Sequence, residues 1–203
     1  GTREPIDTVR FVGNRSSGRM GVALAAEARR RGAHVTLLAA NLSVAVPADV
    51  EVVETATAGE LEREALERSA DADVVIMAAA VADYRPAEAL VHKRPKDRAA
   101  WTVELEPTAD VLATLGASRR PGQVLVGFAA DEGDAGLARA REKLVRKNAD
   151  LFVYNDVGRA DIGFDSADNE VVLISQRGER PVGKASKDEV AAAILDEVES
   201  LIV

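Results

Sequence analysis

The chain has 203 residues, 47% of them hydrophobic, which is enough for one α/β domain over residues 1–203 with a buried core. It has no cysteine and two histidines, so disulfides, thiolate chemistry, iron–sulfur clusters and a three-histidine metal site within one chain are excluded. The net charge of −8 disfavours nucleic acid, and no stretch approaches the roughly 20 apolar residues of a membrane helix. Since the start also lacks a signal-peptide layout, we expect a cytoplasmic protein that binds neither nucleic acid nor membrane.

Short apolar runs alternate with amphipathic runs along the first half of the chain. The apolar runs predict strands at residues 9–12, 34–39, 50–53 and 73–79. One helix is expected at residues 20–31, where Gly32 follows three arginines, and another from Thr57 to about residue 70, where Glu60 completes a capping box. The run at residues 73–79 is apolar throughout, which is typical of a central parallel strand covered on both faces.

The second half begins with residues 84–100, which lack periodicity and carry five basic side chains and two prolines, so we expect a flexible loop at about residues 85–100. Strands are then predicted at residues 101–105, 124–128 and 150–154. Helices are predicted at residues 108–118, with Thr108 as N-cap, at 134–147, and at 186–201, with Ser186 and Glu189 as a capping box. A hairpin is expected to turn at Arg177 and Gly178.

Repeated strand–loop–helix units predict an α/β fold. We expect a three-layer, Rossmann-like arrangement, in which a mostly parallel sheet has helices on both faces and a β-hairpin extension. In such sheets ligands bind at the carboxyl ends of the strands. Three segments that follow predicted strands carry polar chemistry, namely residues 14–18, 79–84 and 128–132.

The turn at residues 13–21 places glycines, Ser16 and Ser17 at the start of a predicted helix. Free N–H groups and the helix dipole make such a turn suitable for phosphate. The turn matches neither the Walker A pattern nor G-x-G-x-x-G. The alternative interpretation, in which Ser16 or Ser17 is an ordinary N-cap, stays open.

Charged residues elsewhere also allow two interpretations each. Asp83 follows small residues and could hold a metal-bound phosphate or a sugar hydroxyl, or it could be a helix cap. Lys93, Arg94 and Lys96 could close over a polyanion, or they could be solvated surface residues. A second cluster ends a predicted helix and could bind an anion, although the helix dipole alone explains most of it; its members are Lys143, Arg146, Lys147 and Asn148.

Taken together, nine runs occur in an order that spans nearly the whole chain: residues 4–11, 14–21, 79–86, 104–112, 126–130, 143–150, 155–157, 163–166 and 169–170. In this combination they resemble the phosphopantothenoylcysteine synthetase family. In bacteria this synthetase is usually the C-terminal half of a bifunctional coenzyme A biosynthesis protein.

The resemblance implies a reaction in which the carboxylate of 4′-phosphopantothenate attacks the α-phosphate of CTP and pyrophosphate leaves. The amine of L-cysteine then attacks the acyl-cytidylate, which gives 4′-phosphopantothenoylcysteine and CMP. The resemblance also implies Mg²⁺ with CTP as co-substrate, and no flavin in this domain. It further implies a homodimer and fusion to, or association with, a flavin-dependent decarboxylase domain.

The resemblance also assigns roles to residues. Asn14 would hydrogen-bond the acyl-nucleotide intermediate, and Lys93 and Lys96 would complete the catalytic set from the loop. Asp83 would hold Mg²⁺ through the phosphates. Contacts with the nucleotide and substrate are implied for Ser16, Ser17, Gly18, Ala79, Ala80, Asp83, Phe128, Lys143 and Lys147.

The sequence departs from the family pattern in two places. The family's Lys-x-Lys-Lys loop motif is Lys93-Arg94-Pro95-Lys96 here, so one cation and one donor are lost, and we expect weaker triphosphate capture or a shifted role for Arg94. The family also has a strand, central to its sheet, immediately before the stretch that begins at Gly1, and the resemblance implies that such a strand is missing.

Two other functions compete with the synthetase. The first is a catalytically impaired nucleotide-binding module of the same fold, used for regulation, which Pro95 favours and which would bind CTP without turnover. The second is an NAD(P)-dependent or flavin-dependent oxidoreductase, which the missing G-x-G-x-x-G disfavours.

Overall fold

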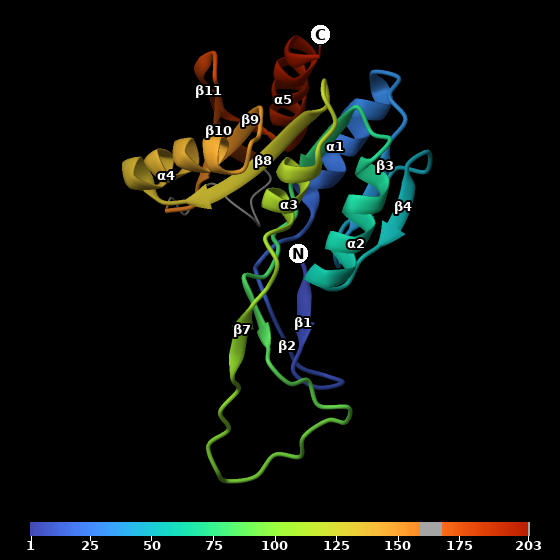
Figure 1. Cartoon of the computed structure of the whole chain (residues 1–203), viewed down its shortest axis with the longest axis vertical. Helices are drawn as coiled ribbons and strands as arrows, with labels where there is room; N and C mark the ends of the chain where they lie inside the picture. Colours follow the sequence, from blue (N-terminus) through green and yellow to red (C-terminus); the bar gives the residue numbers. More distant parts are fainter. Residues whose placement is uncertain (159–167, 203) are drawn as a thin grey trace.

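The computed structural model describes residues 1–158 and 168–202 (Figure 1). Its main sheet has five strands in the order β11-β10-β9-β8-β5. They are β5 (Val74–Met77), β8 (Val124–Asp131), β9 (Leu151–Asp156), β10 (Asp168–Ser175) and β11 (Gly178–Ser186). β5, β8 and β9 pair in parallel, whereas β9–β10 and β10–β11 pair antiparallel. The sheet is therefore mixed rather than mostly parallel, because the predicted hairpin is not an extension but supplies two of its strands.

A separate parallel pair consists of β3 (Thr36–Ala39) and β4 (Glu51–Glu54). β5 pairs with β8 alone among the described strands and is only half-buried, so the prediction of a central strand here is wrong. The start of the chain lies between the ends of β3 and β5. The ammonium group of Gly1 donates to the Ala40 carbonyl (2.7 Å), and the Thr2 N–H donates to the Ala80 carbonyl (3.1 Å).

Helices cover both faces of the main sheet, as predicted. They are α1 (Arg19–Arg30), α2 (Ala58–Ser69), α3 (Val111–Ser118), α4 (Gly133–Arg146) and α5 (Lys187–Leu201). Side chains alternate across a strand, so Val124 and Val126 of β8 pack in the core with α1 and α5. Leu125 and Ala129 pack in the second core, with α2, α3 and α4. None of the described helices is long and apolar enough to cross a bilayer.

The helix starts show where local signals succeed and where one fails. The capping boxes at Thr57 and Ser186 both form, as predicted. The prediction of Thr108 as N-cap is wrong, because α3 begins three residues later and the Asp110 carboxylate accepts from the Ala113 N–H (3.1 Å). The Thr108 hydroxyl instead donates to the Ala82 carbonyl (2.6 Å), which ties the start of α3 to the segment after β5.

An arm made of two antiparallel ribbons projects from the main body (Figure 1). The ribbons are β1 (Arg3–Pro5) with β2 (Phe11–Gly13), and β6 (Tyr84–Pro86) with β7 (Leu105–Pro107). The loop at residues 87–104 forms the tip, so the predicted loop begins after a strand that the sequence analysis missed. The strand predicted at residues 101–105 is also wrong, because only Leu105 pairs and the Trp101 ring instead lies near the guanidinium groups of Arg10 (5.2 Å) and Arg94 (4.9 Å).

The arm is organised around the buried carboxylate of Asp7. It accepts hydrogen bonds from the N–H groups of Val9 (2.8 Å), Arg10 (2.8 Å) and Arg94 (3.2 Å), and from the Arg10 guanidinium (2.7 Å). Burial alone would raise the pKa of Asp7, but the backbone hydrogen bonds and the charge of Arg10 outweigh it and lower the pKa. Asp7 thus connects the β1–β2 turn to the loop at residues 87–104.

Candidate functional site

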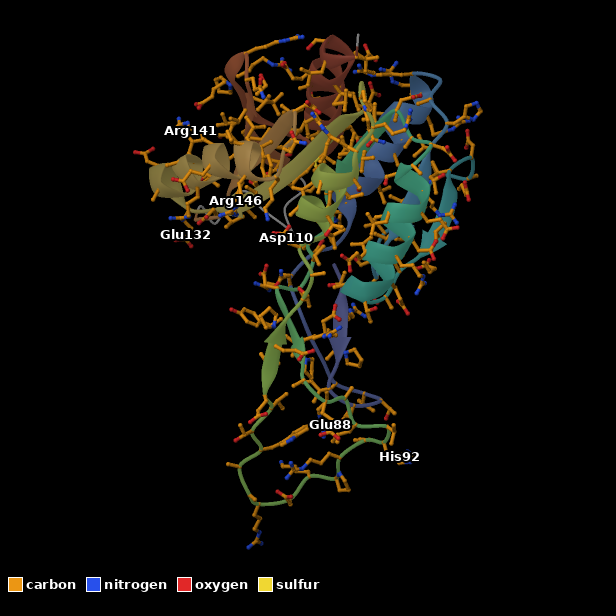
Figure 2. The ribbon with its side chains drawn as sticks, viewed as in Figure 1. Glu88, His92, Asp110, Glu132, Arg141 and Arg146 are labelled. Carbon is orange, nitrogen blue, oxygen red and sulfur yellow. The ribbon has the colours of Figure 1, made fainter. Side chains whose placement is uncertain are left out.

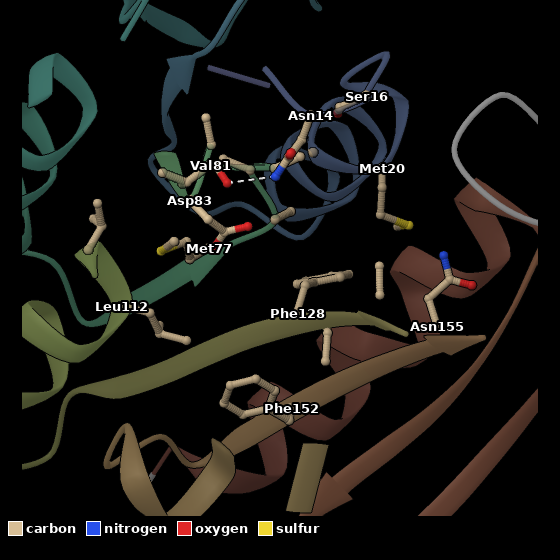
Figure 3. A pocket seen from close by; sticks show the side chains of 18 of the residues that line it. Asn14, Ser16, Met20, Met77, Val81, Asp83, Leu112, Phe128, Phe152 and Asn155 are labelled. Atoms are coloured by element: carbon tan, nitrogen blue, oxygen red, sulfur yellow. Dashed lines mark hydrogen bonds between the residues drawn. The ribbon is translucent and has the colours of Figure 1, made fainter. Parts of the chain in front are cut away.

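A pocket of about 660 Å³ lies over the carboxyl-terminal parts of β5 and β8 and extends between α3 and the end of α4 (Figure 3). Residues 14–18, 78–83 and 128–130 line it, so the structure brings together most of the three polar segments singled out in the sequence, although Tyr84, Asp131 and Glu132 of those segments do not line the pocket. The volume is in the range of small-molecule sites, and the place is the one expected for a parallel arrangement of strands.

The wall next to α1 is the glycine-serine turn. Gly18 is the N-cap residue of α1 with φ +81°, and no side chain caps this helix start, so the interpretation of Ser16 or Ser17 as N-cap is wrong. A Cβ at Gly18 would lie 2.2 Å from Leu42 Cδ2, which is a second reason for glycine here. The first turn of α1 carries no acidic side chain, so no carboxylate of that turn opposes the positive end of the helix dipole, and the turn suits an anion.

The wall after β5 is formed by Ala79, Ala80 and Asp83. Asn14 crosses to it, because its Nδ2 donates to the Val81 carbonyl (2.8 Å), drawn as a dashed line in Figure 3. The same figure shows the Asp83 carboxylate directed toward the pocket. Asn14 and Asp83 therefore lie on one rim, and Phe128 from β8 forms the wall that faces them.

Three cations from the end of α4 border the pocket, namely Lys143, Arg146 and Lys147. The Lys147 ammonium forms an ion pair with the carboxylate of Asp110, and its side chain is only 11% exposed. Burial lowers the pKa of Lys147. The structure thus places the predicted Lys143 and Lys147 at the pocket, together with Arg146 of the same cluster, to which the family resemblance assigned no role.

The loop lysines are not at the pocket. Lys93 and Lys96 are exposed residues of the arm loop and do not line the cavity. Figure 2 shows their neighbours Glu88 and His92 at the far end of the arm, well away from Asp110 and Arg146. For Lys93 and Lys96 to act in catalysis, the loop would have to move to the pocket of its own chain, or a second copy of the chain would have to place its pocket beside the loop.

Several pocket residues were missed by the sequence analysis. They are residues 108–112, Asn155, Asn169 and Lys187. Residues 108–112, Asn155 and Asn169 lie in runs that carried the family resemblance, yet no role was assigned to them. Asn155 could have been found, because it is a polar residue near the carboxyl end of a parallel strand. The run at residues 163–166 lies outside the described residues.

The described residues contain no group of three or more histidine, aspartate or glutamate side chains placed to hold a metal. Mg²⁺ is commonly held by one or two carboxylates together with substrate phosphates and water. Asp83 fits that donor set, because its carboxylate is directed into the same pocket as the anion-suited turn and the cations of α4.

Comparison with known families identifies the chain. Residues 1–202 match the family model described as the DNA/pantothenate metabolism flavoprotein C-terminal domain. The chain belongs to this family. The family resemblance predicted from the sequence is therefore confirmed.

Two curated relatives carry the name coenzyme A biosynthesis bifunctional protein CoaBC. The one from Mycobacterium tuberculosis (strain ATCC 25618 / H37Rv) is 44% identical over 209 residues, with 98% of this chain covered. The one from Vibrio vulnificus (strain YJ016) is 37% identical over 203 residues, with 99% covered. The chain spans about half, 50%, of the length of each of these relatives.

Solved structures support the same assignment. The crystal structure of the C-terminal domain of a CoaBC protein superposes with a TM-score of 0.82 at 36% identity, covering 98% of this chain and 90% of that one. A Cab2 mutant in complex with phosphopantothenate-cysteine superposes with a TM-score of 0.81 at 16% identity, covering 100% of this chain and 85% of that one. At that identity the likeness shows the fold alone.

Proposed function

We propose that the chain is a phosphopantothenate–cysteine ligase domain of coenzyme A biosynthesis. It would join 4′-phosphopantothenate to L-cysteine through an acyl-cytidylate made from CTP, with release of pyrophosphate and then CMP. One observation carries the proposal: a single pocket combines an uncapped helix start, a carboxylate and three cations with an aromatic wall, in a chain of this family.

The charges of the pocket suit a nucleoside triphosphate. The turn at Ser16, Ser17 and Gly18 offers hydroxyl groups and the positive end of α1 to phosphate oxygens. Lys143 and Lys147 add positive charge from α4, where such groups can stabilise the charge that develops as pyrophosphate leaves. We assign phosphate binding to these residues.

The remaining pocket residues suit the acyl group and the base of the proposed acyl-cytidylate. Asn14 is held against the Val81 carbonyl, and we assign it to the acyl-nucleotide intermediate. Phe128 offers a ring surface for the base, and Ala79 and Ala80 let the ligand approach the backbone. Asp83 would hold Mg²⁺ through the phosphates, and the ion when bound would neutralise phosphate charge. No flavin site is proposed in this domain.

The proposed assembly is a homodimer in the cytoplasm, fused to or associated with a decarboxylase domain, as the name of the bifunctional relatives suggests. The arm supports the dimer, because it exposes large apolar side chains, among them Phe11 (51%), Tyr84 (53%) and Val91 (80%). A partner arm would cover this surface and could bring Lys93 and Lys96 to a pocket. Sedimentation of the purified chain would measure the dimer directly.

Pyrophosphate release tests the function. The assay contains Mg²⁺, 4′-phosphopantothenate and L-cysteine, and compares CTP with ATP. We expect release that requires 4′-phosphopantothenate and is faster with CTP. Release that does not depend on 4′-phosphopantothenate would contradict the proposed carboxylate activation, and faster release with ATP would contradict the proposed nucleotide.

One observation favours a second function, a nucleotide-binding module without turnover. Pro95 interrupts the lysine motif, and Lys93 and Lys96 lie away from the pocket. This module would bind CTP in a calorimeter but release no pyrophosphate from a folded sample. An oxidoreductase is disfavoured, because the chain lacks the dinucleotide fingerprint G-x-G-x-x-G.

A further inference from the structure

A fully buried hydroxyl group lies behind the wall of the pocket that follows β5. Thr2 is 0% exposed, and its Oγ1 accepts a hydrogen bond from the Ala82 N–H (2.9 Å). The Thr2 N–H also donates to the Ala80 carbonyl (3.1 Å), although Thr2 itself does not line the pocket. Burial of a hydroxyl group costs free energy unless it is hydrogen-bonded, and valine would fill the same space without that requirement. The hydroxyl therefore points to a task for its bond with Ala82.

A single peptide group connects Thr2 to Asn14 on the rim of the pocket. The Ala82 N–H and the Val81 carbonyl belong to the same rigid peptide plane. Thr2 Oγ1 accepts from the N–H of this plane, and Asn14 Nδ2 donates to its oxygen (2.8 Å; Figure 3). Hydrogen bonds in series polarise one another, so the Thr2 hydroxyl both orients and strengthens the acceptor that holds Asn14. We call this arrangement the Thr2–Asn14 link.

Neighbouring contacts restrict the effect of Thr2 to Asn14. The Thr108 hydroxyl donates to the Ala82 carbonyl (2.6 Å), and the Thr108 N–H donates to the Asp83 carbonyl (3.0 Å). Asp83 therefore keeps its own backbone contacts when Thr2 is changed. Asn14 is exposed, and within residues 1–158 and 168–202 its side chain bonds to the Val81 carbonyl alone. The direction of the Asn14 amide thus depends on that one acceptor.

We propose that Thr2 is a positioning residue for Asn14. Its hydroxyl fixes the peptide group between Val81 and Ala82, and the oxygen of that group holds the Asn14 amide in place for the acyl-cytidylate. This inference rests on the proposed function and adds to it a residue from outside the pocket. A side chain that meets the reacting group must be held in its productive direction, and here the support comes from behind the wall.

The Thr2–Asn14 link can be tested without substrate. Thr2→Val keeps the shape of the side chain and removes the acceptor, whereas Thr2→Ser keeps the hydroxyl group. NMR of the ¹⁵N-labelled chain measures the resonances of the Asn14 Nδ2 group. We expect them to move toward the values of a free asparagine side chain in Thr2→Val and to stay close to the wild-type values in Thr2→Ser.

Asn14→Ala tests the same link from its other end. Asn14 is exposed, so this variant should fold even if Thr2→Val does not. Loss of the Asn14 amide frees the oxygen of the peptide group, so the Ala82 N–H should exchange with solvent about two- to tenfold faster, as for loss of one neutral hydrogen bond. An unchanged exchange rate would show that the two side chains are not coupled.

Pyrophosphate release measures what the link does in the reaction. Thr2→Val should lower kcat about two- to tenfold, and Thr2→Ser should restore most of it. The Kd of CTP should stay within about twofold, because Asp83 and the cations of α4 keep their places. In the Asn14→Ala background Thr2→Val should lower kcat no further, because the side chain through which Thr2 acts is already absent.

Two controls separate positioning from stability. Thr55 is also 0% exposed, but its Oγ1 has no hydrogen-bond partner in the part of the chain that the structure describes, so Thr55→Val should change neither kcat nor the Asn14 resonances. Gln123→Met removes a buried amide whose Nε2 donates to the carbonyls of Ser69 and Ala72, at 2.7 Å each, away from the pocket. It should lower Tm and leave kcat unchanged at temperatures well below Tm.

Three results would overturn the role of Thr2. The first is a Thr2→Val variant with unchanged Asn14 resonances or an unchanged kcat. The second is an equal loss of kcat from Thr2→Val with and without the Asn14 side chain, which indicates a structural role. The third is the same loss of kcat in Gln123→Met at the same fall in Tm. If the wild-type chain releases no pyrophosphate, the proposed function fails and the role of Thr2 in catalysis fails with it, whereas the NMR measurement still decides the link by itself.

Discussion

Lys147, at the end of α4, forms an ion pair with Asp110, the residue that caps α3, and this pair closes one side of the pocket. The two helices also meet through their backbones. Asn148 has φ +49°, and its Nδ2 donates to the Gly116 carbonyl (2.8 Å). The position of the Lys147 ammonium is therefore set both by its own charge partner and by the packing of the chain next to it.

Replacing Lys147 tests its role in phosphate binding. Lys147→Met removes one cation from the pocket, so we expect the Kd of CTP to rise about tenfold or more, since hydrogen bonds to charged groups contribute about 1.5–3 kcal/mol. Calorimetry with CTP and Mg²⁺ measures this. Arg141→Met is the control, because Arg141 lies on the same helix, is 49% exposed and pairs with Glu179 outside the pocket. Equal effects of the two variants would refute a specific role for Lys147.

Asp110→Asn tests the opposite charge of the pair. Asparagine keeps an N-cap acceptor, so the unfolding free energy should change by about 1 kcal/mol or less. The pocket loses one negative charge, so CTP should bind about three- to tenfold more tightly at low salt, and the gain should shrink as salt is added. A titration of CTP at two salt concentrations measures both. Weaker binding would show instead that Asp110 contacts the ligand or its metal.

Gly116→Ala tests the backbone contact between α3 and α4. A Cβ at Gly116 would lie 2.0 Å from the Lys147 carbonyl oxygen, so one helix end must move. We expect a loss of about 2 kcal/mol or more in unfolding free energy and a higher Kd for CTP, because Lys147 moves with its backbone. Gly59→Ala is the control: nothing lies within 4 Å of a Cβ there, and alanine should stabilise α2 by up to about 1 kcal/mol. An unfolding midpoint of Gly116→Ala equal to that of the wild-type chain would disprove the predicted clash.

Arg31 tests the packing of α1 on α5. It donates to Glu27 (2.8 Å), to Asp196 (2.8 Å) and to the Ala192 carbonyl (3.0 Å). Arg31→Met should therefore lower the unfolding free energy by about 1–2 kcal/mol. Arg30→Met should cost less, because that side chain is 71% exposed. Urea titrations at neutral pH compare the two, and a larger loss for Arg30→Met would contradict the assignment.

The same cluster predicts a dependence on pH. Hydrogen bonds from Arg30 and then Arg31 lower the pKa of Glu27 from its ordinary 4.5 to about 2. Because the folded-state pKa lies below the unfolded one, the stability from Glu27 is fully present above pH 4.5 and is lost as pH falls toward 2. Unfolding between pH 6 and pH 3 should show a shallower loss of stability in Arg31→Met than in the wild-type chain. If the wild-type chain and Arg31→Met lose stability equally steeply as pH falls, this cluster is not the cause of the loss.

Pro95→Lys tests the departure from the family's lysine motif. Proline carries no charge and no N–H donor, so lysine would restore a cation to the loop. If the loop captures the triphosphate, turnover and CTP affinity should both rise. Arg94 is unsuited to take over this role in the described conformation, because its guanidinium lies over Trp101 and donates to Asp97 (3.2 Å). No gain in either quantity would refute the hypothesis that Pro95 weakens capture.

Local signals in the sequence were sufficient for much of the fold. The capping boxes at Thr57 and Ser186, the end of α1 at Gly32 (φ +90°) and the hairpin turn at Gly178 (φ +132°) all form as predicted. Each depends on hydrogen bonds or backbone angles within a few residues, so the neighbours in sequence are also the neighbours in space.

The pocket was predicted in part for a similar reason. Segments that follow parallel strands meet at one edge of a sheet, so residues 14–18, 79–84 and 128–132 could be predicted to lie together, and all but Tyr84, Asp131 and Glu132 line the pocket. The ion pair between Lys147 and Asp110 could not be predicted in this way, because it joins two helices that lie far apart in the chain. The position of Asn155 near a strand end could be read from the sequence, but its Oδ1, unpartnered among the described residues, could not, because a buried asparagine looks the same in the sequence whether or not its amide has a partner.

The sequence by itself determined the α/β class, most of the element positions and the family, because these depend on short-range patterns of polarity and on residue identity. Only the tertiary structure decided that β5 pairs with β8 alone among the described strands, that β10 and β11 complete a mixed sheet, and that the loop lysines lie on an arm away from the pocket. These features depend on which strands pair and which side chains meet across long stretches of chain. Pairing of that kind is set by the free energy of the whole packed molecule rather than by any one segment.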